Sequence, residues 1–172
     1  MKSHITPIAV PTDSNIAKQL QGAYFFDSYE MPLAHSGRSA LEIYLGMIGK
    51  TPRWVDFLMG IRNRIVMLFG LKNLGGLGSI RLDKAAAEYL IGDRVGIFTL
   101  LSDTDDEVIM GDSDKHLDVK LSICKRAHGG IQSVATTTVV HTHNLLGRTY
   151  MFFVIPFHKR IAPAVLVRAA IL

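Results

Sequence analysis

The chain has 172 residues, of which 48% are hydrophobic and 20% charged, and its net charge at pH 7 is +4. These values exclude a disordered chain and are typical of one globular domain with a single large core. We therefore expect one domain over residues 1–172, with residues 1–21 as an N-terminal extension.

The N-terminal extension contains Pro7 and Pro11, where a secretion signal needs an unbroken apolar stretch, so we expect no such signal. The first strand is predicted at residues 22–31, an aromatic-rich segment that is followed by Pro32.

A first helix is predicted from Ser39, because Glu42 three positions later completes the spacing of a capping box. It runs to about Gly49, a residue suited to a C-terminal cap.

A second helix is predicted over residues 52–69, with Thr51 as its N-cap and Pro52 in its first turn. Apolar residues cover most of it beside a narrow polar stripe, which favours burial on more than one side. A helix on a membrane surface is the alternative, since Trp54 and the arginines fit one. Asp56 favours core packing.

A glycine-rich stretch, residues 70–81, lacks the Gly-Lys-Ser/Thr ending of a phosphate-binding loop, and we expect a connection followed by a short helix within 83–90. Alternating apolar and polar residues then predict four antiparallel strands. These strands are expected at residues 94–102, 106–111, 115–126 and 131–144. Cys124, the only cysteine, lies in the third and excludes an intrachain disulfide, which favours a reducing, cytoplasmic location.

The last segment, residues 145–171, is predicted to be a helix that Pro156 and Pro163 kink or divide. Its uncharged apolar run is much shorter than the ~20 residues of a spanning helix, so we expect no transmembrane segment. Asp118 is the last acidic residue, and seven lysines and arginines follow it. We interpret these charges as a solvated surface, with contact to phosphate, a membrane surface or acidic substrates as the alternatives.

Histidines come together on the two longest predicted strands. If Gly129 and its neighbour form a two-residue hairpin turn, Asp118 lies opposite His141 and His116 lies opposite His143. Such a set could bind zinc or iron. The same face also carries lysine and small polar residues and is predicted to be the wet one, so we expect no metal and keep these four as the only candidates.

Three stretches of the chain resemble a family of bacterial domains of unknown function that occur alone or behind a short-chain-dehydrogenase-like NAD(P)-binding domain. They are "TPRWVDFLMGIRNRIVMLFGLK", "GDSDKHLDVKLSI" and "HTHNLLGRTYMFFVIPFHKRI". The residues that fit the family pattern are Thr142, His143, Asn144, Gly147, Tyr150, Pro156, Phe157 and His158, whereas His141 departs from it.

The resemblance implies an α+β fold of the helix-grip superfamily, which is START-like and similar to the birch-pollen allergens. In that fold a curved antiparallel sheet wraps around a long C-terminal helix, and two short helices follow the first strand. The pattern of the sequence agrees with this order, although it predicts only five strands where the superfamily often has six or seven. The others are expected in the glycine-rich connection, or the domain is a reduced version.

The helix-grip fold implies a cavity between the sheet and the last helix. Tyr150, Phe153 and Phe157 would line it, although such a stripe also fits plain core packing. His143, Asn144 and Arg148 would supply polar groups at its mouth. For Asn144 we favour a helix cap, and the role of His143 stays open.

The leading hypothesis is non-catalytic binding of a hydrophobic or amphipathic small molecule, without a cofactor. An enzyme of cyclase, isomerase or hydrolase type, using His143 with Tyr150 or Asp118, is the alternative. An interaction module for a reductase-like partner or a membrane surface is a third, and a homodimer stays open. Nucleic-acid binding is not expected, because the basic residues form no cluster interleaved with aromatics.

Overall fold

The computed structural model describes residues 4–33, 37–68 and 84–171. Within them, seven antiparallel strands form one sheet in the order β1-β2-β7-β6-β5-β4-β3. The strands are β1 (Thr6–Pro7), β2 (Phe25–Pro32), β3 (Arg94–Val95), β4 (Phe98–Asp103), β5 (Glu107–Ser113), β6 (Leu117–His128) and β7 (Ile131–Thr142).

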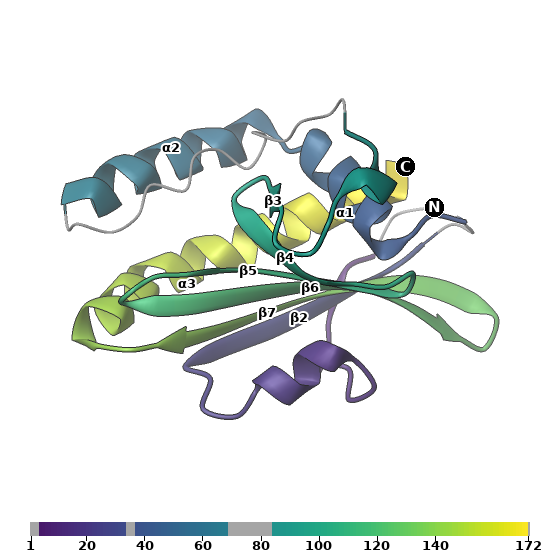
Figure 1. Cartoon of the computed structure of the whole chain (residues 1–172), viewed down its shortest axis with the longest axis horizontal. Helices are drawn as coiled ribbons and strands as arrows, with labels where there is room; N and C mark the ends of the chain where they lie inside the picture. The colour runs from purple at the N-terminus through teal and green to yellow at the C-terminus, as the bar shows by residue number, and fades with distance from the viewer. Residues whose placement is uncertain (1–3, 34–36, 69–83, 172) are drawn as a thin grey trace.

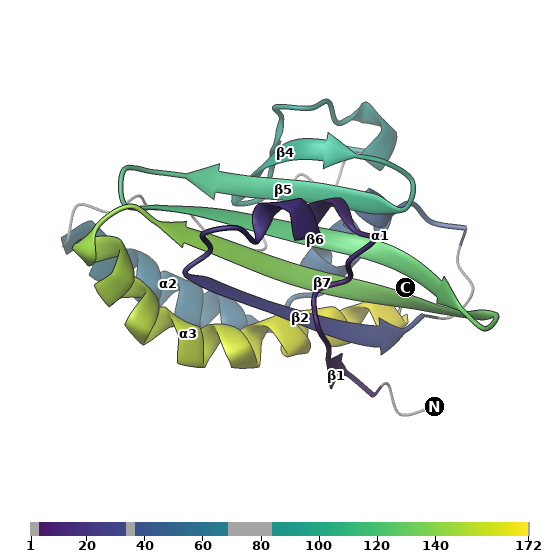
Figure 2. The same cartoon turned by 90° about the horizontal axis from the view of Figure 1, so that it is seen from below.

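The helices lie on one side of this curved sheet, here called the helix side (Figure 1). They are α1 (Ala40–Gly49), α2 (Arg53–Leu68) and α3 (Leu145–Leu166), and α3 continues into the 3-10 helix η3 (Val167–Ile171). The N-terminal segment crosses the opposite, outer side with the 3-10 helix η1 (Asn15–Gln19) (Figure 2). The predicted α+β architecture is confirmed: a curved antiparallel sheet, two helices after the first long strand and a long C-terminal helix.

The register of the central hairpin follows from two glycines. Gly129 and Gly130 have φ values of 56° and 80°, which residues other than glycine rarely adopt. The two glycines form the turn that connects β6 to β7. Asp118 therefore pairs with His141, as predicted. Alternation along β6 then points Val119 and Leu121 to the helix side and Asp118 to the outer side.

The two strands beyond the predicted five are short and lie at the edges of the sheet. β1 comes from the N-terminal extension, and β3 arises because Gly96, with φ 65°, breaks the predicted strand 94–102 in two. The glycine-rich segment 70–81, where additional strands were expected, lies outside the described residues. The short helix expected within 83–90 is present as the 3-10 helix η2 (Ala86–Glu88).

Helix α1 begins with the predicted capping box. The Ser39 side chain accepts a hydrogen bond from the backbone N–H of Glu42, whose carboxylate accepts one from the Ser39 N–H. The prediction that Gly49 caps the other end is wrong, because Lys50 is the C-cap and its φ is −110°. The proline at position 52 already disfavours helical backbone at Thr51, so the helix ends without a left-handed residue.

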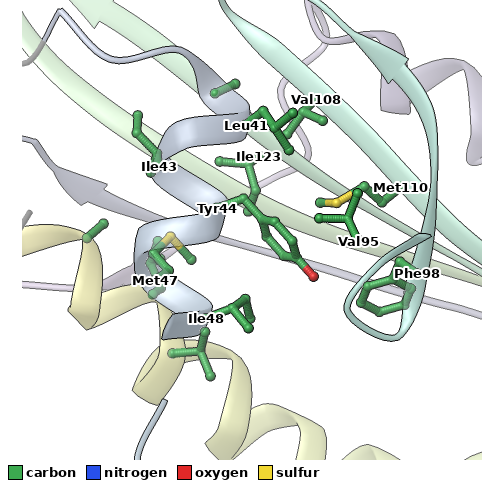
Figure 3. Close-up of a cluster of buried hydrophobic side chains, with 14 of the residues drawn as sticks. Leu41, Ile43, Tyr44, Met47, Ile48, Val95, Phe98, Val108, Met110 and Ile123 are labelled. Atoms are coloured by element: carbon green, nitrogen blue, oxygen red, sulfur yellow. The ribbon is translucent and has the colours of Figure 1, made fainter. Parts of the chain in front are cut away.

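The main core lies between α1 and the middle of the sheet. Figure 3 shows Tyr44 of α1 among Met110, Val95 and Phe98, and all four side chains are buried. The Tyr44 hydroxyl has no hydrogen-bond partner among the described residues. Burial, more than the neighbouring charges, raises the pKa of this phenol well above its usual value.

We expect Tyr44→Phe to raise the free energy of unfolding by about 1 kcal/mol, because the change removes a buried hydroxyl that lacks a partner and keeps the ring. Urea unfolding of the two proteins measures the difference. A loss of stability would show that the hydroxyl has a partner in solution.

Helix α2 differs from its prediction. Among the described side chains of α2, two are buried, Val55 and Asn63, whereas the large apolar residues Trp54, Phe57 and Ile61 are exposed. The prediction that this helix is buried on more than one side is therefore wrong for these side chains. The Thr51 hydroxyl has no hydrogen-bond partner among the described residues, so the predicted N-cap is wrong as well.

Helix α3 runs unbroken through Pro156 and Pro163, which were expected to kink or divide it. It packs across β2 and β7, and its C-terminal end, with Val165 and Leu166, enters the core beside α1. By length and composition the segment Leu145–Ala170 could cross a membrane, with a mean hydropathy of 1.3, although no spanning segment was expected. Core helices of globular domains can have the same length and composition, but they are mostly buried, whereas α3 contacts the sheet with its inner side only.

Candidate functional site

The rotation of α3 about its axis determines which side chains meet the sheet. Gly147 and Met151 are buried on its inner side, and His158 lies further along the same stripe. Gly147 allows the closest approach, because a Cβ atom there would lie 2.3 Å from the carbonyl oxygen of His116. Phe153 and Phe157, predicted to line a cavity, are instead 63% and 53% exposed.

The inner stripe of α3 brings His158 to a carboxylate of β2. Its Nε2 lies 3.1 Å from Asp27 Oδ1, and the two side chains are only 22% and 13% exposed. The ring of Phe25 packs edge-on against the imidazole, with ring centroids 5.6 Å apart. This histidine–aspartate pair therefore lies between helix and sheet rather than on the surface.

Further polar groups surround the pair on the helix side of β2 and β7. Burial and the nearby Asp27 carboxylate raise the pKa of the Tyr29 phenol. Asp27 pairs with Thr138 and Tyr29 with Thr136, so two buried threonines adjoin the cluster. Asp27 Oδ2 and Thr136 Oγ1 are buried with no hydrogen-bond partner among the described residues. A buried polar atom without a partner costs about 1–3 kcal/mol, so a group that supplied the missing hydrogen bond here would be stabilising.

An apolar row continues from this cluster across the sheet. Leu121 of β6 pairs with Thr138, which pairs in turn with Asp27, so the three side chains occupy neighbouring strands on one face. Strands lie about 4.8 Å apart, which places Leu121 and Asp27 about 10 Å from each other. Leu121 and its neighbours Val119 and Leu117 are only half-buried, whereas further along β6, Ile123 is fully buried.

His143 lies at a different place, beyond the end of β7. Its Nε2 is 3.1 Å from Asp118 Oδ1, with the two side chains 42% and 34% exposed. Burial alone would raise the pKa of Asp118, but hydrogen bonds from Ser113 and His143 and the charge of Lys120 bring it below its usual value. Asp118 points to the outer side of the sheet, so this pair and the Asp27–His158 pair are on opposite sides.

Asn144 is the N-cap of α3, as favoured from the sequence. Its Oδ1 accepts a hydrogen bond of 3.0 Å from the Gly147 N–H, and its Nδ2 donates to the Lys115 carbonyl. The side chain also contacts Nδ1 of the buried His116. Of the other predicted site residues, Arg148 is exposed and Tyr150 is half-buried on α3.

The four candidate metal ligands do not come together at one point. Asp118 pairs with His143, His116 contacts Asn144, and His141 lies 3.1 Å from the Gln21 carbonyl oxygen. Across the described parts of the chain, no three side chains of His, Cys, Asp or Glu are grouped so that they could hold a metal ion.

Cys124 is not equipped to act as a nucleophile. It is buried, and burial together with the negative charges of Glu107 and Asp13 raises the pKa of its thiol to about 11. The carboxylate of Glu107 lies on the outer side of the sheet. It accepts hydrogen bonds from the backbone N–H groups of Asn15 and Ile16 and so fixes the start of η1.

Sequence reasoning did not select the Asp27–His158 pair. The two residues are 131 positions apart, and no local pattern relates them. Two signals were present: His158 fits the family pattern, and Asp27 interrupts the apolar inward series of Phe25, Tyr29 and Met31 on β2.

The model of a family described as "Protein of unknown function (DUF2867)" matches residues 19–165. No curated protein matches the chain. No solved structure matches it either.

Proposed function

The chain belongs to the DUF2867 family of proteins of unknown function, and we propose that its domain binds a hydrophobic or amphipathic small molecule between the sheet and α3 without covalent chemistry. The proposal takes the domain as a member of the START-like superfamily, in which the corresponding space holds such molecules. A bacterial, cytoplasmic protein without a cofactor is part of the same proposal.

The observation that carries the proposal is the partly exposed apolar row on the helix side of β6. Val119 and Leu121 point toward the helices and pack against the main core, but they stay partly exposed, although leucine and valine in the middle of a sheet are ordinarily fully covered. A bound apolar molecule would remove this surface from water, with a gain of about 25 cal/mol for each Å² covered.

The polar cluster gives the proposed ligand an orientation. An apolar body over Val119 and Leu121 would direct one end toward Asp27, about 10 Å away. Asp27 Oδ2 and Thr136 Oγ1 lack partners among the described residues, so a hydroxyl or amine on the ligand could supply the missing hydrogen bond. We therefore favour an amphipathic molecule with a donor group at one end over a plain hydrocarbon.

Titration with N-phenylnaphthylamine, an apolar fluorophore with one N–H donor, tests the proposal. We expect saturable binding of one molecule per chain. Leu121→Trp should weaken binding tenfold or more, because the indole fills the space above β6. Ile131→Trp is the matched control, since Ile131 is an exposed apolar residue of β7 at the far end of the hairpin. Equal affinities in all three proteins would contradict the proposal.

An enzyme that uses His143 is the second candidate, because its Nε2 lies within hydrogen-bond reach of Asp118. The carboxylate could orient the imidazole as a general base for a molecule approaching from the outer side. Hydrolysis of p-nitrophenyl acetate that disappears in His143→Gln, with unchanged thermal unfolding, would support this candidate. Hydrolysis that is equal in both proteins would exclude it for this ester.

A further inference from the structure

The outward face of α3 is a regular stripe of two exposed residues in every turn. Gly147, Met151 and His158 turn inward, whereas Tyr150, Val154 and Ile155 are half-buried at the border of the outward face. The exposed positions of α3 are Leu145, Arg148, Thr149, Phe152, Phe153, Pro156, Phe157, Lys159 and Arg160. An exposed helical face is ordinarily polar, and this one is dominated by aromatic and basic side chains.

The aromatic side chains in this stripe are unusually open to solvent. Phe152 is 70% exposed, and Phe153 and Phe157 are 63% and 53% exposed. Phe152 and Phe153 contact each other edge-on at 5.3 Å between ring centroids and so form one continuous apolar surface. A patch of this kind marks an interaction site in a soluble domain.

The charges of the stripe all have the same sign. Arg148, Lys159 and Arg160 are exposed, and no acidic residue follows Asp118 in the chain. No ion pair of these three cations occurs among the described residues. Phenylalanine side chains can enter an apolar layer, and exposed cations can contact anionic groups above that layer. This face is therefore complementary to a surface whose outer layer is anionic and whose interior is apolar.

We propose that the outward face of α3 docks the protein onto an anionic lipid surface, with the three phenylalanines inserted below the headgroups and the three cations at their level. An amphipathic helix in the plane of a membrane has this composition. The Leu145–Ala170 segment is apolar enough by composition to enter lipid, with a mean hydropathy of 1.3, and little of it is buried in the protein, which favours lipid over a polar protein surface. A second apolar face, formed by Trp54, Phe57 and Ile61 of α2, is exposed on the same side of the sheet.

The orientation differs from that of a spanning helix. The inner stripe of α3 stays against β2 and β7, with His158 held by Asp27, so the helix lies flat and exposes one side only. The proposal stands on the outward residues and does not depend on a ligand on the helix side of the sheet.

Flotation of the full chain with vesicles tests this proposal. We expect binding to vesicles of phosphatidylglycerol and phosphatidylcholine in equal parts, little binding to pure phosphatidylcholine, and a decrease with added salt. Phe152→Ser should weaken binding about tenfold, because a phenylalanine buried in the acyl region is worth about 1.5 kcal/mol or more. Arg160→Gln should weaken it about fivefold, the effect of one basic residue near an anionic surface.

Two variants with matched exposure serve as controls. Leu90→Ser removes an apolar side chain that is as exposed as Phe152 but lies outside α3, and Lys18→Gln removes one charge from the outer side of the sheet. Both should bind vesicles like the original chain. All four variants change exposed or half-exposed side chains, and circular dichroism with thermal unfolding confirms that each is folded.

Three results would overturn the proposal. The first is no flotation with the anionic vesicles. The second is flotation that Phe152→Ser and Arg160→Gln leave unchanged. The third is a dimer in analytical ultracentrifugation that Phe152→Ser dissociates, because a second copy of the chain would then cover this face.

Discussion

Gly147→Ala is expected to lower the free energy of unfolding by about 3 kcal/mol, the cost of inserting an atom into a contact that leaves no space for it. The added Cβ would lie 2.3 Å from the carbonyl oxygen of His116 and 3.1 Å from its carbon. Both atoms belong to the backbone, so no side-chain rotation can relieve the overlap. The first turn of α3 would have to move away from the end of the sheet.

Gly60→Ala is the control for this substitution. Gly60 also lies within a helix, α2, but a Cβ atom there would meet nothing within 4 Å. Alanine should raise stability by up to about 1 kcal/mol at this position, because it restricts the unfolded chain more than glycine does. Urea unfolding of the three proteins measures both effects. If Gly147→Ala lost less than about 1 kcal/mol, α3 would not be held as closely to His116 as the structure shows.

Asp27→Ala and His158→Ala are each expected to destabilise the protein by about 3 kcal/mol, since either change leaves the other side chain largely buried without its charged or polar partner. The double variant should lose about 1–2 kcal/mol less than the sum of the two single variants, and this difference is the coupling energy of the pair. Thermal or urea unfolding of the four proteins gives the cycle.

The chain contains a matched control for this cycle. Asp118 and His143 form a second carboxylate–imidazole pair with the same nitrogen–oxygen distance of 3.1 Å, but its side chains are 34% and 42% exposed. Their coupling energy should stay below about 1 kcal/mol, because water solvates both groups when the pair is broken. Equal coupling in the two cycles would show that Asp27 and His158 are as accessible to water as the outer pair.

Much of the sheet could be predicted because its determinants are local. Alternation along β6 identifies the side that carries Val119 and Leu121, and the glycine pair after His128 sets the register of the longest hairpin. The capping box at Ser39 and the N-cap at Asn144 are likewise determined within four residues of each helix start. These predictions were correct because alternation, glycine turns and helix caps are all determined by residues close together in the sequence.

The rotation of α3 could not be predicted in this way. The helix-grip resemblance and the helical spacing of the apolar stripe favoured Phe153 and Phe157 as inward residues, yet both face solvent. The helix instead turns Gly147 toward the backbone of His116 and His158 toward Asp27, and both contacts join segments that are distant in the chain. The rotation therefore depends on close packing and on one buried polar pair, which outweigh the tendency to bury the largest side chains.

The prediction that α2 is buried on more than one side is wrong for a related reason. The periodicity of residues 52–69 shows a wide apolar face, but periodicity does not show whether another element covers it. In the structure Trp54 and Phe57 remain exposed. The alternative that was set aside for this helix, contact with a membrane surface, agrees with the docking proposed for α3.

A crystal structure of the protein purified without denaturation tests the central claim most directly. We predict a small molecule on the helix side of the sheet, in contact with Val119 and Leu121 and with one polar atom within hydrogen-bond distance of Asp27. Side chains of the protein itself closing over Val119 and Leu121, with no molecule between the sheet and α3, would contradict the account.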